Sequence, residues 1–233
     1  MTNQEPLSPV ALQSGNGSAA PRVLIVTAVE AERDAILRGL GGSARRFEVI
    51  AAGAGTAAAA AGTAAMLAGG RFGCVVSAGI GGGFPGRAPV GSLVVASELI
   101  AADLGAETPE GFRSAAELGF GRVLVPAAPA QAAALTAALA AAGLAVSTGP
   151  VLTVSTATGT AETAAALLAR HPGAAAEAME GHGVAVAAEA RGLPVLELRA
   201  VSNPVGPRDR SAWKIGEALD MLSKAAAILL EVL

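Results

Sequence analysis

The chain has 233 residues, 52% of them hydrophobic, and a net charge of −3, which suits one large domain or two small ones with a sizeable core. Aromatic residues make up only 3%, so the core must consist mainly of alanine, valine and leucine. The small, unclustered charge argues against a nucleic-acid partner, because phosphate binding requires a basic footprint.

The cysteine content and the apolar segments exclude further classes of protein. The single cysteine, Cys74, excludes a disulfide within the chain and argues against a cysteine-based metal site. It lies in an apolar run and is expected to be a small buried hydrophobe. Glycines interrupt the alanine-rich runs, so none resembles a membrane span, and the N-terminus lacks the pattern of a secretory signal. These features predict a soluble cytoplasmic protein without a membrane partner.

Secondary structure follows from the spacing of apolar residues. Residues 1–21 are rich in Pro, Ser, Gly and Asn and predict a disordered tail before one domain over 22–233. Strands are predicted at 23–27, 47–51, 73–78, 93–97, 123–125, 150–155 and 195–201. Helices are predicted at 29–40, from after Gly55 to about Ala68, and at 129–142, 161–170, 177–190 and 213–233, the last with an apolar stripe at Ile215, Leu219, Leu222, Ala226 and Leu229. This alternation predicts an α/β fold, a three-layer α/β/α domain with a central mixed, mostly parallel sheet.

Two glycine-rich segments, 53–58 and 81–86, match the dinucleotide-binding fingerprint. The first lacks the acidic residue expected about 20 positions later, since 67–76 contains none. The second leads into a predicted strand instead of a helix. We therefore expect no NAD, and no other cofactor. These glycines either permit tight strand exits or let the backbone at 81–82 approach a flat ligand closely.

Polar residues gather just past the predicted strand ends. In open α/β sheets, ligands bind outside the carboxyl ends of the strands. The residues collected there are Glu30, Glu32 and those at 53–56, 79–84, 155–160 and 202–203.

Five of these and neighbouring segments form a recognisable series. In order and spacing, 27–32, 77–82, 90–95, 178–180 and 199–203 resemble the purine nucleoside phosphorylase and nucleosidase superfamily. Within it, 102–112 and 202–213 are similar to the futalosine hydrolases of the menaquinone pathway. The resemblance implies a nucleoside phosphorylase-like fold, release of hypoxanthine from futalosine by hydrolysis, no metal, and a homo-oligomer built on a dimer.

Roles follow from the resemblance residue by residue. Glu32 matches the carboxylate that activates water, Met179 and Glu180 match the pair that holds the ribose, and Asn203 matches the residue at the purine N7 edge. Glu32 and Asn203 are thus the expected catalytic residues. The expected substrate-binding residues are Ile80, Gly81, Gly82, Phe84, Thr158, Gly159, Thr160, Met179, Glu180 and Arg210.

The two carboxylates suit cleavage of a nucleoside C1′–N9 bond on chemical grounds as well. Glu32 can act as a base, and Glu180 can accept from both ribose hydroxyls. The alternative for Glu32 is that it complements the helix dipole near an N-terminus. The alternative for Glu180 is a solvated helix position, although burying an unpaired carboxylate is costly and favours a ligand partner.

The carboxamide of Asn203 bears on which base is bound. It can donate an N–H to a 6-oxo group and accept from a protonated N7, and such a site can discriminate strongly. It therefore favours hypoxanthine or guanine over adenine. The alternative is an asparagine that begins a turn before Pro204.

Residues that would contact the rest of the substrate are less defined. No aromatic residue occurs at 155–160, so Phe84 is one candidate for stacking on the purine. Arg208 and Arg210 suit the benzoate of futalosine, or belong to a solvated loop. Open alternatives are a purine nucleoside phosphorylase, which would need arginines near 53–55 and 79–81, a methylthioadenosine/adenosylhomocysteine nucleosidase, and a non-catalytic nucleoside-binding protein.

Overall fold

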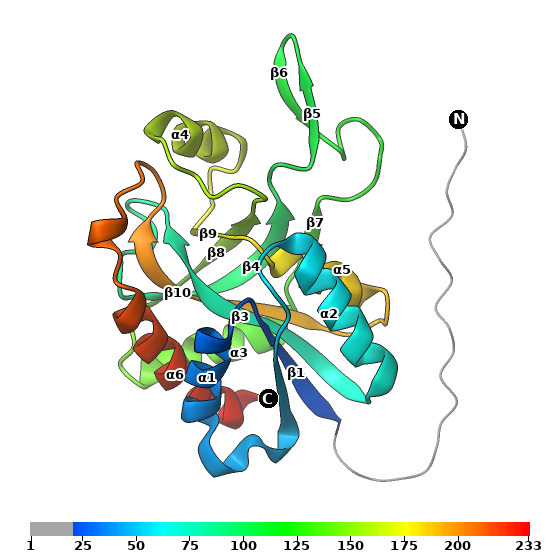
Figure 1. The fold of residues 1–233 in the computed structure, drawn as a ribbon, viewed down its shortest axis with the longest axis vertical. Coiled ribbons are helices and arrows are strands. Elements are labelled where there is room, and N and C mark those ends of the chain that lie inside the picture. Colours follow the sequence, from blue (N-terminus) through cyan, green and yellow to red (C-terminus); the bar gives the residue numbers. More distant parts are fainter. Residues whose placement is uncertain (1–20) are drawn as a thin grey trace.

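The computed structural model describes residues 21–233, so the predicted disordered tail lies outside the described residues except for Pro21. A mixed sheet occupies the centre, with helices on both faces (Figure 1). The strands are β1 (Arg22–Thr27), β2 (Phe47–Ala51), β3 (Phe72–Gly83), β4 (Leu93–Ala101), β5 (Gly105–Thr108), β6 (Gly111–Ser114), β7 (Leu124–Pro126), β8 (Val146–Thr153), β9 (Ala176–Ala178) and β10 (Val195–Pro204). The helices are α1 (Glu30–Leu40), α2 (Thr56–Gly69), α3 (Pro129–Ala141), α4 (Ala161–Arg170), α5 (Gly181–Glu189) and α6 (Ile215–Val232), with short 3-10 helices η1 (Gly41–Arg46) and η2 (Arg210–Ala212).

Strand pairing in the main sheet is mixed and mostly parallel, which confirms the predicted fold class. The order is β10-β4-β8-β9-β3-β1-β2, with β7 beside β4. The long strand β3 also pairs with β10, in parallel, and with β9, antiparallel. Strands β3, β10, β4, β8 and β9 therefore close into a ring, and the carboxyl ends of β3 and β10 lie at its rim beside β9.

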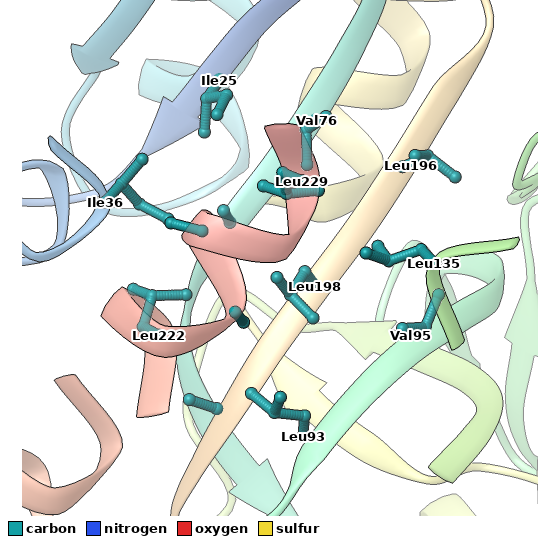
Figure 2. Packing of buried hydrophobic residues seen from close by; sticks show 14 of the residues in the cluster. Ile25, Ile36, Val76, Leu93, Val95, Leu135, Leu196, Leu198, Leu222 and Leu229 are labelled. Atoms are coloured by element: carbon teal, nitrogen blue, oxygen red, sulfur yellow. The ribbon is translucent and has the colours of Figure 1, made fainter. Parts of the chain in front are cut away.

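Each face of the sheet is covered by helices whose apolar residues pack on the strands. On one face, α1, α3 and α6 enclose a cluster that includes Ile36, Leu135 and Leu222 (Figure 2). On the other, α2 and α5 pack on strand residues such as Val26 and Val201. Burial on both faces explains why the strands read as continuous apolar runs.

The predicted helix at 177–190 is wrong in its first turn. Residues Ala176–Ala178 form β9, which pairs with both β3 and β8, and the helix begins only at Gly181. Alanine and glutamate favour a helix locally, but here the backbone pairs with strands on both sides. Glu180 therefore lies at a strand-to-helix junction and not within a helix.

Two further differences concern the periphery. The hairpin of β5 and β6 was not predicted and projects from the body of the molecule (Figure 1). The inward stripe of α6 consists of Ala218, Leu222, Ala225, Ala226 and Leu229. The predicted positions Leu222, Ala226 and Leu229 are thus confirmed, whereas Leu219 is only partly buried and Ile215 is exposed. Among the described helices, none has the length and apolarity to cross a membrane.

Candidate active site

A pocket opens at the carboxyl ends of the central strands, where the sequence places polar residues. Its walls come from segments far apart in the chain: the start of α1, the ends of β3 and β10, and the β9–α5 junction. Of the predicted residues, it brings together Glu32, Ile80, Gly81, Gly82, Thr158, Met179, Glu180 and Asn203. The lining also includes Glu177, Arg208 and Trp213.

Glu32 is buried, and three backbone N–H groups donate to its carboxylate. Oε2 accepts from Ala28 at 2.9 Å and Val29 at 3.2 Å, which caps the start of α1. Oε1 accepts from Ile80 at 2.9 Å. The bonds from Ala28 and Val29 show that Glu32 does cap the helix, as the alternative held. The bond from Ile80 on β3 also fixes its carboxylate at the pocket wall.

Glu180 is held from three sides at the β9–α5 junction. Its Oε1 accepts from the N–H of Gly55 at 3.1 Å, and its Oε2 accepts from the N–H of Met179 at 3.2 Å. The Arg199 Nη1 forms an ion pair with Oε2 at 3.2 Å. The side chain is 7% exposed, so it is a buried, paired carboxylate and not the solvated one considered as an alternative.

Arg199 is one of two residues to which the sequence assigned no role, and its ion pairs hold the side chains at this end of the pocket. Its guanidinium, 1% exposed, also donates from Nε to Glu197 Oε1 at 2.8 Å and from Nη2 to Ser77 Oγ at 3.0 Å. We call Glu32, Glu180, Glu197 and Arg199 the arginine cluster. In the sequence, this cluster is indicated by Glu197 and Arg199 within an otherwise apolar strand, because buried charges must be paired.

Burial and charge act against each other in the arginine cluster. Burial works to lower the pKa of Arg199, but the carboxylates of Glu197, Glu180 and Glu32 outweigh it and raise that pKa. Burial also raises the pKa of Glu197, against the opposing effect of Arg199. Oε2 of Glu197 has no hydrogen-bond partner among the described residues, and Gly181 makes room for it, since a Cβ there would lie 2.2 Å away.

Asn203 lies at the other end of the pocket, as the last residue but one of β10. Its Oδ1 accepts from Ser202 Oγ at 2.8 Å, and its Nδ2 donates to the carbonyl of Pro204 at 3.0 Å. The local turn bond that was considered as an alternative is therefore present. It uses one of the two amide protons, which leaves the other for a ligand in the pocket.

Four predicted residues lie outside the pocket lining. Phe84 is fully buried in a cluster with residues such as Leu152 and Leu167, so it is unavailable for stacking on a base. Thr160 caps α4 by accepting from the N–H of Thr163, and the carbonyl of Gly159 accepts from the N–H of Arg208. Core packing therefore accounts for Phe84, and structural hydrogen bonds account for Gly159 and Thr160.

The aromatic side chain that does line the pocket is Trp213. The guanidinium of Arg208 lies 5.0 Å from its ring centre, and that of Arg210, the fourth predicted residue outside the lining, lies 5.8 Å away. The sequence offered Trp213 only as part of a resemblance to relatives. In the structure, η2 directs the segment after β10 back over the pocket, and this brings Trp213 into the pocket lining.

Glu177, on β9, is a third buried carboxylate at the pocket, and the sequence assigned it no role. The N–H of Thr158 donates to Oε1 at 2.8 Å, and the Thr158 hydroxyl donates to Oε2. Burial raises the pKa of Glu177, although both Thr158 bonds act to lower it. Among residues 21–233, no group of three or more His, Cys, Asp or Glu side chains could hold a metal ion.

Comparison with known proteins identifies the family. The family model of the phosphorylase superfamily matches residues 34–233. A futalosine hydrolase of Streptomyces coelicolor is 54% identical over 91% of this chain and 96% of its own length. One from Acidothermus cellulolyticus is 46% identical over 88% of this chain and 89% of its own. The chain belongs to the phosphorylase superfamily and, within it, to the futalosine hydrolase family.

Solved structures of this family and its relatives share the fold. Futalosine hydrolase of Helicobacter pylori superposes with a TM-score of 0.78 at 16% identity, covering 91% of this chain and 98% of that one. The 5′-methylthioadenosine/S-adenosylhomocysteine nucleosidase of Neisseria meningitidis, in complex with methylthio-immucillin-A, gives 0.76 at 20% identity over 92% and 100%. The two activities therefore occur on one fold, and the residues at the pocket must distinguish them.

Proposed function

We propose that the protein hydrolyses the N-glycosidic bond of futalosine and releases hypoxanthine and dehypoxanthine futalosine, in menaquinone biosynthesis. The observation that carries this proposal is the gathering of Glu32, Glu180 and Asn203 on one pocket in a chain 54% identical to a futalosine hydrolase. The proposal includes a cytoplasmic homodimer or higher homo-oligomer, as the resemblance to the superfamily implies.

In the proposed mechanism, one end of the pocket binds the ribose and activates water, and the other end binds the departing base. Water adds to C1′ as the C1′–N9 bond breaks, and the electron pair of that bond leaves with the purine. Glu32 takes a proton from the water, and the departing purine anion takes one from solvent to become hypoxanthine. Glu180, oriented by Arg199 and the N–H of Gly55, accepts from the ribose hydroxyls, and its negative charge favours the positive charge that develops on the sugar.

Asn203 supports the departure of the base. Its free amide proton can bind the O6–N7 edge of hypoxanthine, where negative charge accumulates as the bond breaks. Ser202 donates to Oδ1 and Nδ2 donates to Pro204, so one amide proton and one lone pair of Oδ1 remain for the ligand. Trp213 and the Arg208 guanidinium above it suit the benzoate-bearing part of futalosine, since an arginine pairs well with a carboxylate.

A phosphorylase is less well supported, because the groups that could hold phosphate already have partners. The N–H of Gly55 donates to Glu180, and that of Ile80 donates to Glu32. Arg199 is engaged by two carboxylates. The negative charges of Glu32 and Glu180 would repel a phosphate ion at C1′, whereas they would not repel a neutral water molecule.

The test is base release from three nucleosides, each with and without phosphate. We expect hypoxanthine from futalosine at a rate that phosphate does not change, and much slower release from inosine and methylthioadenosine. Chromatographic separation of the free base measures each rate. Phosphate-dependent release would instead indicate a phosphorylase, adenine from methylthioadenosine would indicate the related nucleosidase, and no release from any substrate would indicate a binding protein.

A further inference from the structure

Glu177 shares a rung of the sheet with Asn203, with a glycine between them. Gly82 on β3 pairs with Glu177 on β9 on one side and with Asn203 on β10 on the other. Side chains of laterally paired residues point to the same face of a sheet, and all three residues line the pocket. The fold therefore sets a carboxylate and a carboxamide side by side across a position that has no side chain.

The space at the glycine between them is tight. A Cβ at Gly82 would lie 2.9 Å from Val205 Cγ2 and 3.3 Å from Asn203 Nδ2. Strands β9 and β10 flank β3 in the closed ring of strands, so both side chains reach the same pocket. This arrangement suits a flat base that presents two adjoining edges to the two side chains.

The carboxylate of Glu177 is fixed in place but lacks a cation. Both of its oxygens accept from Thr158, and the residue is only 7% exposed. Within residues 21–233, no Lys, Arg or His nitrogen pairs with it, whereas Glu180 and Glu197 both pair with Arg199. Each carboxylate oxygen can accept a second hydrogen bond, and a buried charge without a cation is stabilised by a further donor.

A 6-oxopurine presents the matching pattern. Its six-membered ring carries an N1–H donor, and the acceptors O6 and N7 lie along the adjoining edge. We infer that Glu177 accepts the N1–H of the 6-oxopurine while Asn203 binds the O6–N7 edge, so that Glu177 is the residue that selects hypoxanthine over adenine. Adenine has a lone pair at N1 and would set it against the carboxylate, a repulsive contact that discriminates by cost. The inference rests on the proposed function for the identity of the base.

The test measures binding of free bases, because binding does not require turnover. Calorimetric titration of the full chain should show hypoxanthine binding roughly 10- to 100-fold more tightly than adenine, as expected for a hydrogen bond to a charged group. In Glu177→Gln, the carboxamide can present an N–H to adenine N1, so this preference should fall by about tenfold or more. Glu162→Gln makes the same change at an exposed position on α4 and should leave the preference unchanged.

A ligand change on the unaltered protein tests the inference if the variant fails to fold. 1-Methylhypoxanthine lacks the N1–H and should bind at least about tenfold more weakly than hypoxanthine. Equal binding of the two, or an unchanged preference in a folded Glu177→Gln, would overturn the inference. If futalosine is hydrolysed in either of those cases, the proposed function stands alone. If futalosine is untouched but the preference depends on Glu177, only the proposed function fails.

Discussion

The two ends of the pocket are built in opposite ways. In the arginine cluster, each charged side chain is buried and comes from a strand, a strand–helix junction or the first turn of α1. At the β10–α6 connection, Arg208 and Arg210 are exposed and lie over Trp213. Buried ion pairs are costly to break, whereas exposed ones contribute little. The first end is therefore fixed before substrate arrives, and the second can adjust to it.

This difference fits the proposed chemistry. Groups at the reacting carbon must be held closely, because small displacements there cost much of the rate. The distant part of a substrate needs recognition but no such precision. Substitutions at matched positions of the two ends can test whether the contrast is real.

The largest expected effect is the loss of turnover in Glu32→Gln. The amide cannot take the proton from water, so hydrolysis should slow by about 10²- to 10⁴-fold, while hypoxanthine should still bind within a few-fold. Single-turnover hydrolysis and calorimetry measure the two quantities. Glu30→Gln is the matched control, since Glu30 lies in the same helical turn with a side chain 79% exposed. Full activity in Glu32→Gln would remove this residue from the mechanism.

Next in size is the change in stability when either arginine is replaced. Arg199→Met should lower the free energy of unfolding by about 3–5 kcal/mol, because it leaves buried carboxylates uncompensated. Arg208→Met removes only an exposed contact with Trp213 and should cost less than about 1 kcal/mol. Urea denaturation of both variants gives the comparison. Similar values for the two would contradict the contrast between the ends.

The smallest effect concerns added volume. In Gly181→Ala, the new Cβ would lie 2.2 Å from Glu197 Oε2, and the ion pair with Arg199 prevents that carboxylate from moving freely. We expect a loss of about 1–3 kcal/mol. In Gly159→Ala, the nearest atom is Arg208 Cβ at 3.9 Å, so stability should stay within about 0.5 kcal/mol. Thermal melting measures both, and a tolerated Gly181→Ala would show that the arginine cluster can relax.

Much of the fold was predictable because local patterns and tertiary structure agree. β2 occurs at the predicted residues 47–51, where an apolar run forms the edge strand beside β1. The failures lie where they disagree. Ala176–Ala178 forms a strand despite its helical composition, because β3 and β8 both offer it backbone partners. Phe84 was predicted to face a ligand, but its side chain turned into the core.

By itself, the sequence determined the class of fold, the edge of the sheet at which the pocket lies, and three of its polar groups, Glu32, Glu180 and Asn203. Strand ends and residue chemistry are local properties, so they can be read from the chain. Only the tertiary structure decided that Arg199 joins two of the carboxylates and that Glu177 lies across Gly82 from Asn203. Those relations depend on strand register and on the ring closed by β9, where one residue of slippage would turn each side chain to the opposite face.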